Sequence, residues 1–258
     1  MKISTTRAAK QTKKISKLFK RIFILLFWLL IWELCSLFIN NTILFPSPFG
    51  VFKALLVLMG KIYFWQSVGK SIFRVIVGII LSIVIGIILG IISGINNFME
   101  ELMNPLIVTI KSTPVISVII IVLVWVNSSN VAILTNVLMC FPIIYTNVLQ
   151  GIKNVNSDLI EMAHIYKVKR SYILKDIYLP SIKPYVISGI LMCLGIGWKI
   201  CVASEVLSTP RYSIGLNLLN AKSILETEEL FAWTIIVVLL SFIFETIFKY
   251  YIKNKTER

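Results

Sequence analysis

Residues 75–92 read VIVGIILSIVIGIILGII, eighteen consecutive positions without a charged side chain. An apolar run of about 18 residues or more is long enough to cross the hydrocarbon core of a bilayer as a helix. Small residues recur at every fourth position in and just beyond this run: Gly78, Ser82, Gly86, Gly90 and Gly94. Such a stripe allows close approach of a second helix in lipid. It predicts a static packing surface in preference to a sliding surface used in gating.

The rest of the chain repeats this pattern. Of its 258 residues, 57% are hydrophobic and 15% are charged, against about 45–50% and about 25% in soluble domains. The apolar runs are 22–39, 75–92, 105–126, 131–148, 185–206 and 230–249. We therefore expect an all-α integral membrane protein with six transmembrane helices in a domain over 22–252, and the composition excludes a single soluble domain.

Basic residues gather on one side of these spans. Residues 1–21 hold eight basic side chains and no acidic one, 153–183 hold six, and 249–258 hold four, whereas the opposite loops carry five. Because Lys and Arg concentrate in cytoplasmic loops, both termini and the 151–183 loop are expected to be cytoplasmic. The basic tail 1–21 favours the anionic surface of the bilayer over nucleic acid, and 253–258 form a second cytoplasmic tail.

Few side chains suit catalysis or metal binding. His164 is the only histidine, and none of the four cysteines forms a C-x-x-C pair. The chain also lacks the G-x-x-x-x-G-K-[ST] loop that holds nucleotide phosphates. We therefore expect no catalytic residues, no metal and no cofactor, and no ATP hydrolysis by this chain.

The cytoplasmic loop has an amphipathic character. Asp158 favours a helix start, and Leu159, Ala163 and Tyr166 follow at helical spacing. Such a short helix needs a surface on which to bury its apolar side. Either the membrane surface or a cytoplasmic partner would provide one.

This loop resembles the "EAA" loop of permeases in bacterial binding-protein-dependent ABC importers. The resemblance lies in the order Glu161-Met162-Ala163, a basic stretch, and Ile177-x-Leu179-Pro180, with Lys167 where the family carries glycine. Three further segments are similar to the nitrate, sulfonate and taurine branch of that family: LFPSP at 44–48, KSTP at 111–114 and WKICVASE at 198–205.

The resemblance implies a type I ABC importer permease in the cell membrane. The loop would dock on a separate ATPase subunit, two permease subunits would pair, and an extracytoplasmic binding protein would deliver a small solute. An anion such as nitrate, sulfonate or taurine is the favoured class. The expected ATPase-coupling residues are Glu161, Met162, Ala163, Lys167, Leu179 and Pro180. The alternative is a secondary transporter driven by an ion gradient.

Ionisable side chains inside spans are candidates for the translocation path. Lys199 lies about halfway along the fifth span, and Glu205 follows six positions later, which is not a pairing distance on one helix. Lys199 either lines the path or pairs with a neighbouring helix. Lys111 stands beside Pro114, where we expect a kink.

Overall fold

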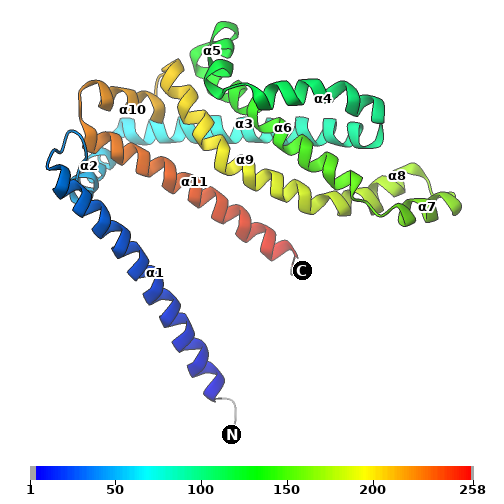
Figure 1. Ribbon diagram of the computed structural model, residues 1–258, viewed down its shortest axis with the longest axis horizontal. Coiled ribbons are helices and arrows are strands. Elements are labelled where there is room, and N and C mark those ends of the chain that lie inside the picture. The colour runs from blue at the N-terminus through cyan, green and yellow to red at the C-terminus, as the bar shows by residue number, and fades with distance from the viewer. Residues whose placement is uncertain (1–3, 257–258) are drawn as a thin grey trace. The chain divides into compact units, whose positions relative to one another are not determined.

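The computed structural model describes residues 4–256, and the side chains of residues 1–18, Arg21 and 255–258 are not described. The ends of the two expected cytoplasmic tails, 1–3 and 257–258, lie outside the described residues. Within the described chain every regular element is helical (Figure 1). The helices are α1 Ser4–Ile39, α2 Pro48–Met59, α3 Ile62–Ile95, α4 Asn97–Ser112, α5 Val115–Trp125, α6 Ser128–Lys153, α7 Ser157–Ile165, α8 Arg170–Tyr172, the π-helical segment η1 Ile173–Tyr178, α9 Leu179–Ser208, α10 Ile214–Ser223 and α11 Thr227–Thr256. The all-α fold class is confirmed.

Five helical segments among the described residues are long and apolar enough to cross a membrane. They are Ile22–Ile39, Ile62–Ile95, Ser128–Lys153, Arg170–Ser208 and Thr227–Asn254. Helices α4 and α5 together meet the same criteria as one bent span, which brings the number to six. The expected range 105–126 falls on this bent pair.

The bend between α4 and α5 is 105°, and it occurs at the Ser112-Thr113-Pro114 segment. Thr113 and Pro114 both have extended backbone angles. Proline lacks an N–H group and disfavours helical geometry in the residue before it. Pro114 therefore ends α4 and lets α5 begin in a new direction.

The chain divides into two compact units. The smaller one consists of residues 4–60 and 220–233 of the described chain, and its aromatic contacts join Trp32, Phe45 and Phe231, with ring centroids 5.8–6.5 Å apart. The LFPSP segment at 44–48 leads into α2. The hydroxyl of Ser47 accepts a hydrogen bond from the N–H of Gly50 at 3.1 Å and so caps the first turn. Serine at this position and proline directly after it are typical of a helix start.

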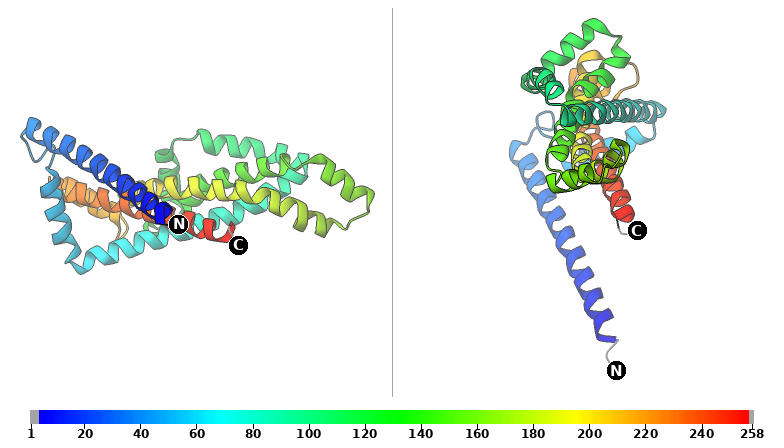
Figure 2. Two further views of the ribbon diagram at one scale, coloured as in Figure 1. Left: turned by 90° about the horizontal axis from the view of Figure 1, so that it is seen from below. Right: turned by 90° about the vertical axis from the view of Figure 1, so that its right-hand side faces the viewer.

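The larger unit, 61–219 with 234–256 of the described chain, is built around α3, α6 and α9, which run side by side (Figures 1 and 2). The small residues of α3 face α6 in a constant register, in which residue n of α3 meets residue n + 58 of α6. The contacts pair Gly78 with Asn136, Gly86 with Ile144, Gly90 with Val148 and Gly94 with Ile152. A constant positive offset means that the two helices run in the same direction.

Helix α9 runs in the opposite direction to α6. Gly151 of α6 packs on Tyr185 at the beginning of α9, whereas Gly197 near the other end packs on Asn136. The second and fourth spans are thus parallel and the fifth is antiparallel to them. This is the order that a chain must have when it crosses the membrane alternately in each direction.

The α3–α6 contact leaves no room for additional atoms. A methyl group on Gly86 would lie 2.6 Å from Cβ of Ile144, whereas one on Gly69 of the same helix would meet nothing within 4 Å. We expect Gly86→Ala to destabilise the protein by roughly 1–3 kcal/mol through overpacking. Gly69→Ala should be neutral or slightly stabilising, because alanine favours the helix. Thermal unfolding of the two detergent-solubilised variants checks this, and equal midpoints would contradict it.

Candidate functional site

The loop between α6 and α9 folds as a helical hairpin at the ends of these two helices (Figure 2). Asn156 begins α7, because its side-chain oxygen accepts a hydrogen bond from the N–H of Asp158 at 2.9 Å. On the inner side of the hairpin Ala163 and Ile173 are buried, with 3% and 6% exposure. The small side chain of Ala163 therefore lies where the two arms of the hairpin meet.

Lys167 closes α7 in a left-handed conformation, with φ of 51°. Its N–H donates to the carbonyl of His164 at 3.0 Å, and the N–H of Val168 donates to the carbonyl of Ala163 at 2.9 Å. These two bonds form the Schellman motif that commonly ends helices, in which glycine is the usual residue at the left-handed position. The turn therefore forms here without the glycine of the resembled loop.

The outer side of the hairpin is apolar, and the described part of the chain leaves it exposed. The exposed fractions of Leu159, Met162, Ile165 and Tyr166 are 44%, 49%, 77% and 76%. Glu161 is also exposed, on the same helix. Leu179 and Pro180, the first residues of α9, are exposed as well.

Two of the charged residues predicted inside spans remain exposed to the surroundings of the chain. Lys111 is exposed at the end of α4, where its ammonium group donates to the hydroxyl of Thr146 at 2.6 Å. Pro114, also exposed, lies across the break from it. Lys199 is exposed on α9, and no ion pair involves it among the described residues.

Glu205 lies in a different environment, because it is fully buried and paired with Arg74 of α3. One guanidinium nitrogen of Arg74 donates to Glu205 Oε1 at 2.9 Å. The hydroxyl of Ser71 lies 2.7 and 2.8 Å from the two carboxylate oxygens, and the N–H of Gly215 donates to Oε2 at 3.1 Å. The Glu205 carboxylate thus joins α3, α9 and the beginning of α10.

Arg74 uses its remaining N–H groups to hold the turn between α9 and α10. It donates to the carbonyls of Tyr212 and Arg211 at 3.3 and 3.5 Å, and to that of Ser129 at the start of α6 at 3.2 Å. A buried charge is tolerated when it is paired and its hydrogen-bonding groups are satisfied. The cluster of Ser71, Arg74 and Glu205 therefore positions the α9–α10 turn.

Sequence reasoning did not predict this cluster. Glu205 was assigned to the path, and its partner lies 131 positions earlier, at the edge of the second span. One signal was available, because Arg74 directly precedes an uninterrupted apolar run and an unpaired arginine there would be costly. That signal does not tell which carboxylate pairs with it.

The geometry described here is that of a multi-span helical protein with a structured hairpin between two spans. Residues 82–256, more than half of the chain, match the family described as the binding-protein-dependent transport system inner membrane component. The chain belongs to this family. It is accordingly a multi-pass inner-membrane permease of the ABC importer class, and the predicted family resemblance is confirmed.

Relatives and a solved structure agree with the family. The chain is 31% identical over 202 residues to the putative aliphatic sulfonates transport permease protein SsuC of Escherichia coli, covering 78% of this chain and 76% of that protein. It is 24% identical over 218 residues to the taurine transport system permease protein TauC of the same organism, covering 82% and 79%. In fold it is similar to a chain of the MetNI methionine ABC transporter, with a TM-score of 0.57, 15% identity, and coverage of 72% of this permease and 95% of that chain.

Lys167 offers a test of the loop geometry in this permease. Lys167→Gly removes the strain that a side chain causes in a left-handed backbone conformation, so it should stabilise the closed turn by about 1 kcal/mol. Amide hydrogen exchange at residues 163–168 should slow by roughly fivefold, as expected for a stabilisation of this size. Lys169→Gly is the matched control, because Lys169 has an ordinary φ of −61°. Equal exchange in both variants would contradict this account of the turn.

A second test concerns the buried ion pair. Glu205→Gln leaves the Arg74 charge buried without its counter-charge, so stability should fall by about 3–5 kcal/mol. Replacing both residues, Arg74→Met with Glu205→Leu, should restore most of the loss. Glu245→Gln breaks the more exposed pair with Lys249 on α11 and should cost only about 0.3–0.5 kcal/mol. Thermal unfolding in detergent measures all three, and similar losses for Glu205→Gln and Glu245→Gln would refute the role assigned to the cluster.

Proposed function

We propose that this permease forms the translocation path for a small solute, delivered by an extracytoplasmic binding protein and moved by ATP hydrolysis on a separate ATPase subunit. The permease works as a homodimer in the bilayer. The solute is an anion of the nitrate, sulfonate or taurine kind. Family membership supports the ABC importer class, and the names of the relatives, which refer to sulfonates and taurine, support the solute class.

In this proposal both termini and the α7–α8 hairpin are cytoplasmic. The charge distribution supports this, because 18 of the 26 Lys and Arg residues fall in the tails and the 153–183 segment. The helix directions agree with it. Since α3 and α6 are parallel and α9 is antiparallel to them, the α6–α9 connection lies on the side where α3 ends.

The observation that carries the coupling role is the exposed apolar side of α7. Leu159, Met162 and Tyr166 lie at spacings that place them near one another on the helix, outside the long spans. Exposed apolar residues rimmed by charges are typical of a protein interface. We assign this side, with Glu161 at its edge and Lys167 holding the turn, to the ATPase contact. Leu179 and Pro180 carry displacements of the hairpin into α9.

The path contacts are assigned to two charged residues of the expected spans that form no ion pair among the described residues. Lys111, beside the break at Pro114, and Lys199 on α9 are exposed cations that would attract an anion. Glu205 has a different part, because Arg74 neutralises it. It holds the end of the path in shape instead of contacting the solute.

Co-purification tests the proposal. From detergent-solubilised native membranes, the tagged permease should recover an ATPase subunit. Glu161→Lys and Met162→Asp should each reduce that recovery at least tenfold, because they place a charge of the wrong sign or an unmatched charge in an apolar contact. Glu101→Lys, the same substitution at an exposed residue of α4, is the matched control and should leave recovery unchanged. Isolation of the chain alone, together with uptake that follows an ion gradient and ignores ATP, would overturn the proposal in favour of a secondary transporter.

A further inference from the structure

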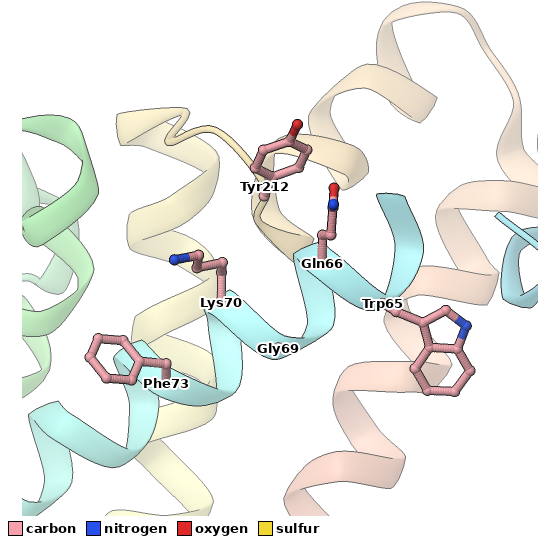
Figure 3. A pocket seen from close by; sticks show the side chains of 6 residues that line it. All are labelled: Trp65, Gln66, Gly69, Lys70, Phe73 and Tyr212. Atoms are coloured by element: carbon pink, nitrogen blue, oxygen red, sulfur yellow. The ribbon is translucent and has the colours of Figure 1, made fainter. Parts of the chain in front are cut away.

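A pocket of about 450 Å³ opens beside the first turns of α3. Its lining residues are Trp65, Gln66, Gly69, Lys70, Phe73 and Tyr212 (Figure 3). Pockets that bind small molecules have volumes of about 300–1,000 Å³. The volume is therefore sufficient for a ligand of modest size.

One face of α3 supplies most of the lining. Gln66, Lys70 and Phe73 follow one another at intervals of four and three positions, so they share a face of the helix. Gly69 lies between them, and a methyl group there would meet nothing within 4 Å. The absence of a side chain at this position keeps the floor of the pocket open.

The opposite wall is Tyr212, and the buried cluster fixes it in place. Its backbone is left-handed, with φ of 54°, and its carbonyl accepts a hydrogen bond from Arg74 at 3.3 Å. Arg74 is in turn held by Glu205. A residue in a costly backbone conformation persists only where the surrounding contacts hold it in that conformation. The pocket wall is therefore built into the fold.

Lys70 is the charged residue in the lining of the pocket, and Arg211 lies beside Tyr212 next to it. No carboxylate of the described chain forms an ion pair with Lys70 or Arg211. The Arg211 guanidinium lies 4.9 Å from the ring centre of Tyr212 and donates to its hydroxyl at 3.1 Å. Because the Tyr212 oxygen accepts this bond, its own hydrogen remains available to donate to a ligand.

We propose that this pocket binds a single oxyanion group, a sulfonate, phosphate or carboxylate, that carries an apolar tail. Lys70 supplies the counter-charge, and Gln66 and Tyr212 supply hydrogen-bond donors. The apolar tail lies against the ring of Phe73, which is 60% exposed and lies on the same side of α3 as Lys70 (Figure 3). Two sources have this chemistry, a free aliphatic anion and the head group of an anionic phospholipid. The pocket lies within a few turns of the beginning of α3, where its apolar run starts, as an interfacial site would.

The test is equilibrium binding, so it does not depend on transport or on the ATPase. Purified permease in a neutral detergent is titrated with hexanesulfonate by calorimetry. Lys70→Gln, which removes the counter-charge, and Gly69→Leu, which fills the floor with the charge intact, should each weaken binding at least tenfold. Lys61→Gln is the matched control, because it removes a charge at the start of the same helix outside the pocket, and it should bind as the unaltered protein does.

A second arm separates the two sources. The titration is repeated in nanodiscs of phosphatidylcholine with and without phosphatidylglycerol. Competition by phosphatidylglycerol supports the site with a lipid head group as its occupant, whereas undiminished hexanesulfonate binding supports the site with a free anion as its occupant. Equal affinity of the unaltered protein, Lys70→Gln and Gly69→Leu for hexanesulfonate would overturn the proposal in either form.

Discussion

The close contact between α3 and α6 is the constraint on which the rest of the larger unit depends. Apolar side chains that leave lipid for a helix–helix contact gain little hydrophobic free energy, because lipid is itself apolar. Helices in a membrane therefore associate through close packing and hydrogen bonds. Gly86 and Gly90 let the Cβ atoms of Ile144 and Val148 reach the backbone of α3, where a methyl group would lie only 2.6–2.8 Å away. The fixed register that results sets the direction of α6. It also places Asn136 at the level where α9 packs on both helices through Gly197.

Charge compensation is the second constraint, and it divides the ionisable residues into two kinds. Arg74 and Glu205 cancel each other in a buried cluster whose hydrogen bonds are satisfied by Ser71, Gly215 and carbonyls of the neighbouring turn. Such a pair is weak evidence for high stability, because removing two charges from water is costly. It is better evidence for a defined geometry. Lys111 and Lys199 have no such counter-charge among the described residues, which is why we propose them, and not Glu205, as contacts of the solute.

Local patterns in the sequence predicted those features of the fold that a single segment determines. Hydropathy is sufficient to find the spans, and the four-residue repeat from Gly78 to Gly94 marks the face of α3 that meets α6. Lys167 stands where the family carries glycine, yet the left-handed turn forms there, because two backbone hydrogen bonds hold a residue with a side chain in this costly backbone conformation. The pairing of Arg74 with Glu205 was out of reach, since it depends on how α3 and α9 cross in space. The 105° bend was also out of reach, because proline predicts a break but not its angle.

Helix α9 connects two features that lie far apart in the fold, the cytoplasmic hairpin of the proposal and the buried cluster at Glu205. It begins at Leu179, directly after the hairpin proposed to contact the ATPase, and it reaches Glu205 near its other end. Its 30 residues span about 45 Å at the usual rise of 1.5 Å per residue. A helix packed along its length on α6 moves as a unit more readily than it bends, because closely packed interfaces shift between discrete arrangements. We therefore propose that a displacement of the hairpin would shift Glu205 and, through Arg74, the turn that carries Tyr212. In the proposed mechanism α9 therefore links the hairpin at its start to the cluster near its other end that holds the turn with Tyr212.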